Sequence, residues 1–210
     1  AGRYYSKSEI KKLILIAKRK KIWVIIDEAY SDFMEKKFYS AFNFIKMYSN
    51  IIVINSLSKN FGISGWRIGY AISNSRFISN LLKLNQHLIT CAPSILMNYL
   101  ELYFDDLIKI TKPQIKNLIK KRNKIKKYLT KNNFVFLEGS STFYFFVKLD
   151  HYKFDILNLC LYLLLKYNIA VVPGQAYGSS TKKFIRLSIG TETEERIFDS
   201  IRIINSILKK

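Results

Sequence analysis

The fold is decided by the stretch Asn55-Ser56-Leu57-Ser58-Lys59-Asn60-Phe61-Gly62-Ile63-Ser64-Gly65-Trp66-Arg67-Ile68-Gly69-Tyr70. An apolar run, Ile51 to Ile54, precedes it and stops at a polar turn that carries two serines and a lysine. Such a run predicts a buried parallel strand that reaches the carboxyl edge of a sheet. Open α/β sheets bind their ligands at that edge. The sequence therefore predicts an α/β fold with a ligand site around Lys59.

The side chains of this turn indicate a phosphate-bearing ligand beside a reactive amine. A lysine at a sheet edge is shielded from water by the sheet and its helices, so its amine can be partly neutral and nucleophilic. Ser56, Ser58 and Arg67 supply donors suited to a phosphate dianion. Together these features predict pyridoxal phosphate as the cofactor.

A second apolar run, Ile22 to Asp27, ends on an acid and is followed by Glu28-Ala29-Tyr30. This run predicts a second buried strand, whose acid lies at the carboxyl end. Taken alone, Asp27 would be interpreted as a helix cap. Both apolar strands end in side chains that can bind pyridoxal phosphate, which favours contact between Asp27 and the cofactor.

These segments resemble the class I and II aminotransferases, the aspartate-aminotransferase-like group of fold-type-I pyridoxal-phosphate enzymes. The resemblance covers essentially all 210 residues and is carried by the stretch quoted above, by Asp-Glu-Ala-Tyr at 27–30 and by Pro-Gly-x-x-Tyr-Gly at 173–178. It implies the C-terminal part of a large, mostly parallel sheet domain over residues 1–110. A linking helix and a small C-terminal α+β domain would follow over residues 111–210.

The resemblance implies three catalytic residues. Lys59 would carry the cofactor as an aldimine and shuttle a proton, and Asp27 would pair with the pyridine nitrogen. Tyr30 would donate a hydrogen bond to the phenolic oxygen. The implied enzyme is an aminotransferase of amino acid metabolism, in a cytoplasmic homodimer. It would move an amino group between an amino acid and a 2-oxo acid.

The resemblance also implies the binding residues. Ser56, Ser58 and Arg67 would anchor the cofactor phosphate. Arg186 lies in a strand predicted over residues 184–188 and would bind the α-carboxylate of the substrate, because a guanidinium pairs with a carboxylate through two parallel hydrogen bonds. Taken alone, Arg186 would be interpreted as a surface ion-pair residue.

Two alternative functions stay open at this point. A pyridoxal-phosphate-dependent carbon–sulfur β-lyase on the same fold would share the lysine and the arginines. A ligand-sensing aminotransferase-like domain of a transcription regulator would accord with the formal net charge of +20. The lysines are scattered and no nucleic-acid motif accompanies them, so we expect no nucleic-acid partner. No apolar run approaches the ~20 residues of a membrane span, so we expect no membrane partner.

Four further expectations concern individual positions. Ala1-Gly2 resembles the end of the family's Asn-Pro-x-Gly motif, which predicts that this chain is the C-terminal part of a longer enzyme and inactive alone. Ser141 stands where the family usually has a glycine. Pro113 predicts the first turn of a helix that follows another over about 94–104. Cys91 and Cys160 lie in apolar helical surroundings, which predicts two core thiols in a reducing cytoplasm.

Overall fold

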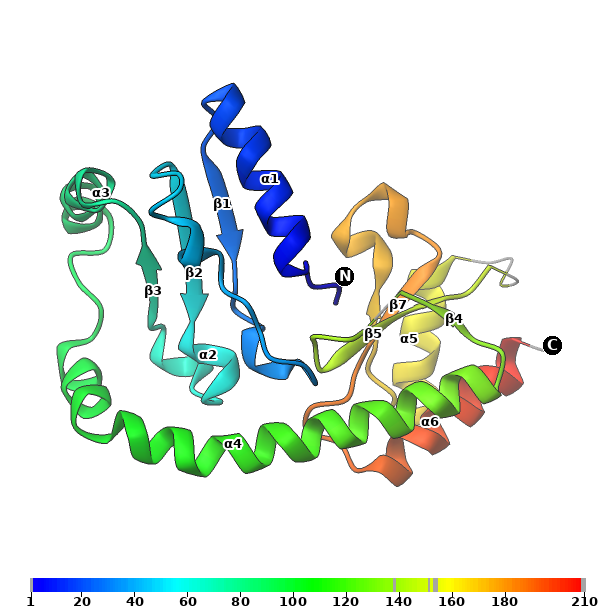
Figure 1. The fold of residues 1–210 in the computed structure, drawn as a ribbon. Helices are drawn as coiled ribbons and strands as arrows, with labels where there is room; N and C mark the ends of the chain where they lie inside the picture. The colour runs from blue at the N-terminus through cyan, green and yellow to red at the C-terminus, as the bar shows by residue number, and fades with distance from the viewer. Residues whose placement is uncertain (1, 138, 151, 153–154, 209–210) are drawn as a thin grey trace. The chain divides into compact units, whose positions relative to one another are not determined.

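The computed structural model describes residues 2–137, 139–150, 152 and 155–208, whose ribbon is shown in Figure 1. The chain divides into two compact units. The first unit is Tyr4–Ile115, and the second unit is Lys116–Lys210 together with Ala1–Arg3.

The first unit is built on a three-stranded sheet in the order β1-β2-β3. Its strands are β1 (Val24–Asp27), β2 (Ile51–Ser56) and β3 (Gly69–Ile72). The strands β1 and β2 are parallel, whereas β3 is antiparallel to β2. The strand β3 begins only at Gly69, because Arg67 adopts a left-handed backbone (φ 57°) that closes the turn before it.

Helix α1 (Lys7–Lys20) covers this sheet and begins at a capping box. The Ser6 side chain accepts from the Glu9 backbone, and the Glu9 carboxylate accepts from the Ser6 N–H at 2.8 Å. One apolar face of the helix is buried in a small cluster with the sheet. Its fully buried members are Ile10, Ile14, Ala41, Phe44, Ile51 and Val53.

Short helices and one long helix complete the first unit. The short ones are η1 (Ser31–Phe33), η2 (Ala41–Phe44), α2 (Leu57–Asn60) and η3 (Ser64–Trp66), and the longer α3 spans Ser75–Leu88. Helix α4 (Ser94–Lys131) runs on into the second unit. No helix among the described residues is both long and apolar enough to cross a membrane.

The predicted helix start at Pro113 is wrong, because Pro113 lies inside α4. A proline removes one helical hydrogen bond, but the helix formers on both sides continue the helix past it. The backbone leaves helical geometry at Tyr103 instead (φ −121°, ψ 17°). At this point the ring of Tyr103 packs against Tyr99, and the ring of Phe104 packs edge-on against Phe61.

The second unit contains an antiparallel sheet in the order β4-β5-β7-β6, with α5 and α6 packed against it (Figure 1). Its elements are β4 (Val135–Phe136), β5 (Tyr144–Lys148), α5 (Ile156–Tyr167), β6 (Val172–Pro173), η4 (Gly174–Tyr177), η5 (Ser179–Thr181), β7 (Phe184–Ser188) and α6 (Glu194–Leu208). The residues just before β6, 169–171, form no strand. The Ile169 N–H instead donates to the Leu163 carbonyl and closes the end of α5.

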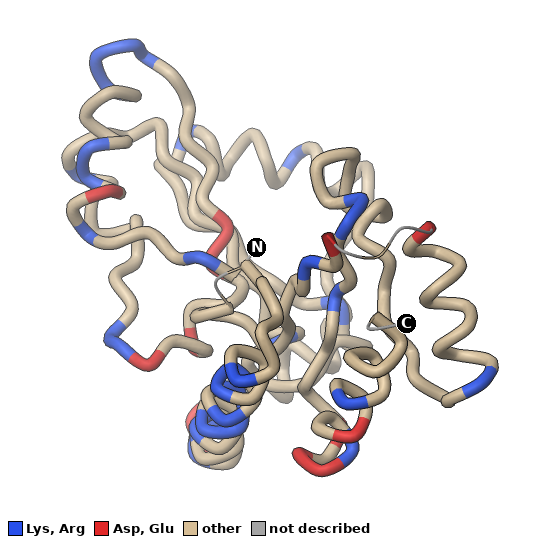
Figure 2. The backbone as a smooth tube through the Cα atoms, turned by 90° about the vertical axis from the view of Figure 1, so that its right-hand side faces the viewer, with Lys and Arg blue, Asp and Glu red and all other residues tan. Residues whose placement is uncertain are grey.

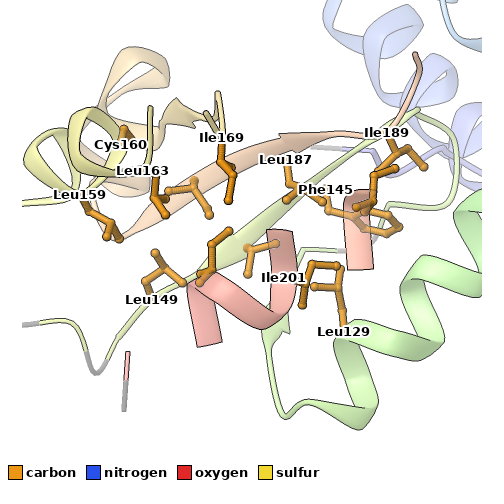
Figure 3. Packing of buried hydrophobic residues seen from close by; sticks show 14 of the residues in the cluster. Leu129, Phe145, Leu149, Leu159, Cys160, Leu163, Ile169, Leu187, Ile189 and Ile201 are labelled. Carbon is orange, nitrogen blue, oxygen red and sulfur yellow. The ribbon is translucent and has the colours of Figure 1, made fainter. Parts of the chain in front are cut away.

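One connected core holds the second unit together. Figure 3 shows side chains from α4, α5, α6 and the sheet meeting around Phe145, Leu163 and Ile201. Cys160 is part of this core, as predicted. The same prediction is wrong for Cys91, which is exposed. Cys91 follows the end of α3, after Thr90 has adopted a left-handed backbone (φ 73°), and so lies outside the helix.

The basic residues are spread over many segments of the backbone (Figure 2). Ser141, which replaces the family's usual glycine, has a defined partner within the second unit. Its N–H and its Oγ both donate to the Gly2 carbonyl, at 3.1 and 2.9 Å, and Ser140 Oγ donates to the same oxygen at 3.2 Å. The tight approach in this loop is at Gly139, where a Cβ would lie 2.7 Å from the Phe145 ring.

Candidate active site

The carboxyl ends of β1 and β2 lie at the same edge of the first unit's sheet, because the two strands are parallel (Figure 1). Asp27 pairs with Ile54, and the Glu28 N–H extends the ladder by donating to the Ile54 carbonyl at 2.8 Å. The strand β2 ends two residues later, at Ser56. Two of the predicted motifs therefore begin side by side.

Asp27 is exposed at this edge. One carboxylate oxygen, Oδ1, accepts from the Ala29 N–H at 2.9 Å and shapes the turn that follows the strand. Among the described residues the other oxygen accepts no hydrogen bond. Tyr30 is half-buried at the start of η1, with its ring 5.9 Å from the buried Phe33 ring.

Ser56 ends β2 and caps the single turn α2 that carries Lys59. Its Oγ accepts from the Ser58 N–H at 3.2 Å, and its own N–H donates to Asn55 Oδ1 at 2.7 Å. Leu57 and Ser58 form the buried side of α2, which leaves Lys59 on the exposed side. The expectation that sheet and helices shield this lysine is wrong for this chain, because a four-residue helix has only one side that it can bury.

Arg67 lies between η3 and β3, in the left-handed backbone conformation. Its Nη1 donates to the Ser64 carbonyl at 2.9 Å, which folds the exposed side chain back over the turn. Gly69 then enters β3 against Ser56, where a Cβ would lie 2.7 Å from the Asn55 carbonyl oxygen. Only glycine allows this approach, so the glycine of the motif keeps the Arg67 turn close to the end of β2.

Arg186 lies on β7 in the second unit, between Phe146 on β5 and Val172 on β6. Its guanidinium carbon is 5.4 Å from the centre of the Tyr144 ring and 5.5 Å from that of Tyr177. Its Nε is buried and has no hydrogen-bond partner among the described residues. Burial raises the pKa of the Tyr144 hydroxyl, and the positive charge of Arg186 offsets part of this rise.

The structure thus gathers the predicted site residues in two places. The first unit holds one group at a single sheet edge: Asp27, Tyr30, Ser56, Ser58, Lys59 and Arg67. The second unit holds Arg186. The residue types of the first group fit pyridoxal phosphate, since they combine an exposed amine, a carboxylate with an unused oxygen, and hydroxyl and guanidinium donors. Within the described residues no cluster of three or more His, Cys, Asp or Glu could hold a metal ion.

Two polar residues behind this edge were missed in the sequence. Glu28 is only 6% exposed, and its Oε1 accepts from the Ala41 N–H at 2.8 Å. Burial raises the pKa of Glu28, and the hydrogen bonds from Ala41 and Ser40 oppose this rise. Asn55 is 7% exposed and holds the Ser56 backbone. The sequence shows only that each of these polar residues lies near the end of an apolar strand. Polar residues at such places are buried in some proteins and exposed to solvent in others, so the pattern does not predict their burial.

Comparisons with known proteins agree with this arrangement. The family model described as aminotransferase class I and II matches residues 1–198. A (5-formylfuran-3-yl)methyl phosphate transaminase of Methanocaldococcus jannaschii is 32% identical over 193 residues, which cover 90% of this chain and 50% of that protein. An aspartate aminotransferase of Thermotoga maritima is 27% identical over 212 residues, covering 99% of this chain and 53% of that protein.

A crystal structure of a Thermotoga maritima aspartate aminotransferase matches the fold with a TM-score of 0.83 at 25% identity. The match covers 100% of this chain and 54% of that one. The chain therefore spans about half the length of the curated relatives it matches. The predicted α/β fold class is confirmed. None of these three proteins is named as a β-lyase or a transcription regulator.

Proposed function

Because the chain belongs to the class I and II aminotransferase family, we propose that the complete protein is a pyridoxal-phosphate-dependent aminotransferase. It moves an amino group from an amino acid to a 2-oxo acid. The observation that carries this proposal is the sheet edge at which β1 ends in Asp27 and its parallel neighbour β2 leads into α2 with the exposed Lys59. The predicted fold-type-I group is confirmed by the same family membership.

When bound, pyridoxal phosphate supplies an aldehyde that takes up amino groups and a pyridine ring that accepts the electrons released at the substrate Cα. Lys59 Nζ is the group that holds the cofactor covalently. The same nitrogen, once released from the cofactor, would be the base that takes the proton from the Cα of the amino acid and delivers it to the former aldehyde carbon of the cofactor. Lys59 lies on the exposed side of a single helical turn, where the cofactor and the substrate can reach its side chain.

Asp27 and Tyr30 tune the ring. The carboxylate oxygen of Asp27 that the Ala29 N–H leaves unused keeps the ring nitrogen protonated by charge and hydrogen bonding. Tyr30 donates its hydroxyl to the phenolic oxygen. The buried Phe33 supports the Tyr30 ring from behind, so the hydroxyl is presented from a defined place.

Ser56, Ser58 and Arg67 hold the phosphate. They lie on the segment from the end of β2 through α2 and η3 to the start of β3, and the close pairing of Gly69 with Ser56 ties the two ends of that segment together. Hydroxyl donors and a guanidinium provide directed hydrogen bonds to a dianion. Arg186 of the second unit binds the α-carboxylate of the substrate.

The proposal includes a homodimer in the cytoplasm. Helix α3 has no buried residue in this chain, and its Leu82 and Leu88 are 62% and 80% exposed. An exposed apolar surface of this kind is typical of a region that another protein chain covers. Cys91 and Cys160 are both free thiols, which accords with a reducing compartment.

Borohydride reduction tests the central assignment. The complete protein, loaded with pyridoxal phosphate and reduced, should carry a pyridoxyl group on Lys59, mapped by peptide mass spectrometry. The matched control is Lys83→Ala, which removes an exposed lysine on α3 and should leave the labelling unchanged. A label on any lysine other than Lys59 overturns the proposal.

A further inference from the structure

The guanidinium of Arg186 is flanked by two tyrosines from different elements. Tyr144 belongs to β5, and Tyr177 belongs to the turn η4. Both ring centres lie within 5.5 Å of the guanidinium carbon, a distance at which an aromatic ring attracts a cation. Segments that are 33 positions apart in the sequence thus enclose one side chain.

Both rings are held in place by one buried phenylalanine. Phe146 pairs directly with Arg186 across the strands and is 5% exposed. Its ring packs edge-on against Tyr144 at 5.9 Å and against Tyr177 at 5.1 Å. The position of each tyrosine is therefore set by the core of the second unit.

The turn that carries Tyr177 is also fixed. Thr181 Oγ1 lies 2.7 Å from the Gly174 carbonyl and 3.0 Å from the Gly178 carbonyl, so its hydroxyl closes the loop. At Gly174 a Cβ would collide with the Thr181 carbonyl oxygen and with Phe184. Gly178 adopts a φ of 123°, which glycine tolerates and other residues rarely adopt. The Pro-Gly-x-x-Tyr-Gly sequence therefore forms a fixed loop that places the Tyr177 ring next to Arg186.

Arg186 forms no salt bridge with an acid among the described residues. A carboxylate partner from the protein would neutralise the guanidinium and compete with a carboxylate ligand. Aromatic rings attract the cation without taking up its hydrogen bonds, so the group keeps its charge and its donors. The buried Nε that lacks a partner shows that at least one donor is unused.

We propose that Tyr144 and Tyr177 are positioning residues that hold the Arg186 guanidinium ordered and un-neutralised for the carboxylate of the amino acid and the 2-oxo acid. This inference rests on the proposed function, since it assigns a task to the two rings at the carboxylate site of that reaction. It makes the aromatic residue of the 173–178 loop, together with Tyr144, a determinant of substrate affinity.

The test compares ring loss with hydroxyl loss. Tyr177→Leu and Tyr144→Leu should each raise KM for the amino acid about 5- to 30-fold, because each removes one cation–ring attraction. Tyr177→Phe and Tyr144→Phe keep the ring and should stay within about threefold of the parent protein. The value of kcat should change less than KM. Thermal unfolding followed by circular dichroism identifies any variant that has lost its fold. If a Leu variant does not fold, the comparison of the Phe variants with the parent protein tests the inference.

A second readout does not depend on turnover. The Kd of succinate, a non-reacting dicarboxylate, is measured by calorimetry on the complete, cofactor-loaded protein and should rise with the same factors. In an Arg186→Lys background, Tyr177→Leu should have little further effect, because the rings act through Arg186.

The inference is overturned if the Phe and Leu variants lose the same affinity, or if Tyr177→Leu weakens succinate binding equally with and without Arg186. Failure of the proposed function is recognised separately. In that case Lys59 carries no pyridoxyl label in the parent protein, whatever the tyrosine variants do.

Discussion

The two units of this chain differ in how completely each forms a core. The second unit packs α4, α5, α6 and one face of its central strands into one connected cluster. The first unit has two smaller clusters, and it exposes large apolar side chains on β1 and α3, among them Ile25 and Leu88. Its site residues follow the same pattern, since Asp27, Lys59 and Arg67 are exposed whereas Arg186 of the second unit is half-buried.

This difference separates two requirements of a catalytic site. The positions of Asp27 and Lys59 are set locally, by a parallel strand pair and one helical turn. The shielding of such groups from water needs surrounding chain, and the first unit does not provide it by itself. The second unit combines position and shielding at Arg186, because two tyrosines and a buried phenylalanine surround it.

The largest expected effect is at the exposed lysine of the first unit. Lys59→Ala in the complete protein should lower kcat by several orders of magnitude, about 10⁴-fold or more, because one nitrogen serves as both nucleophile and base. Steady-state transamination kinetics measure this, with Lys83→Ala as the control. A loss of less than tenfold would mean that the sheet edge of the first unit does not carry the chemistry.

A core substitution should distinguish the two units by stability. Phe145 is fully buried in the second unit, and Phe145→Ala should destabilise it by about 3–5 kcal/mol. Lys83→Ala, at an exposed polar position of α3 in the first unit, should stay within about 0.5 kcal/mol. Hydrogen exchange resolved by peptide should show faster exchange in β5 and β7 for the Phe145→Ala variant. Equal effects of the two substitutions would contradict the core assigned to the second unit.

The two thiols allow the two units to be compared by the reactivity of one cysteine in each. Burial raises the pKa of Cys160 to about 11, so at neutral pH this thiol is protonated as well as enclosed in the second unit's core. Cys91 of the first unit is exposed. Iodoacetamide at pH 7 should therefore label Cys91 at least about 100-fold faster than Cys160 in the native protein. Equal rates, measured by mass spectrometry, would contradict the core assigned to the second unit.

The smallest expected effect concerns Glu28 behind the sheet edge. Burial raises its pKa in the folded state, so the folded state binds a proton more tightly than the unfolded state does. The Glu28 contribution to stability is thus complete at pH values below its ordinary pKa and is lost as the pH rises through the raised one. A glutamine cannot ionise, so the stability of the Glu28→Gln variant should lack the part of the pH dependence that Glu28 contributes.

Unfolding temperatures between pH 4 and pH 7 measure the difference between the parent protein and Glu28→Gln. Glu101→Gln, at an exposed position of α4, is the matched control and should reproduce the parent profile. Parallel profiles for all three proteins would mean that water reaches Glu28 in the first unit.

The sequence by itself determined the local geometry of both regions. The Ser6–Glu9 capping box, the apolar runs of β1 and β2, and the segment from Ser56 to Gly69 each follow from interactions between residues close in sequence. Such interactions are set by backbone propensity, capping and glycine conformations, which the sequence displays directly. The residues assigned to the cofactor could be named for this reason, and their roles stay predictions.

Tertiary structure alone decided which groups are shielded and which partners they meet. Ser141 meets the Gly2 carbonyl from the far end of the chain, Arg186 meets Tyr177 through the folding of the 173–178 loop, and Pro113 is absorbed inside α4. Lys59 is exposed although its strand is buried. Burial and long-range contacts depend on how whole elements pack, so a residue's neighbours in the sequence do not fix them.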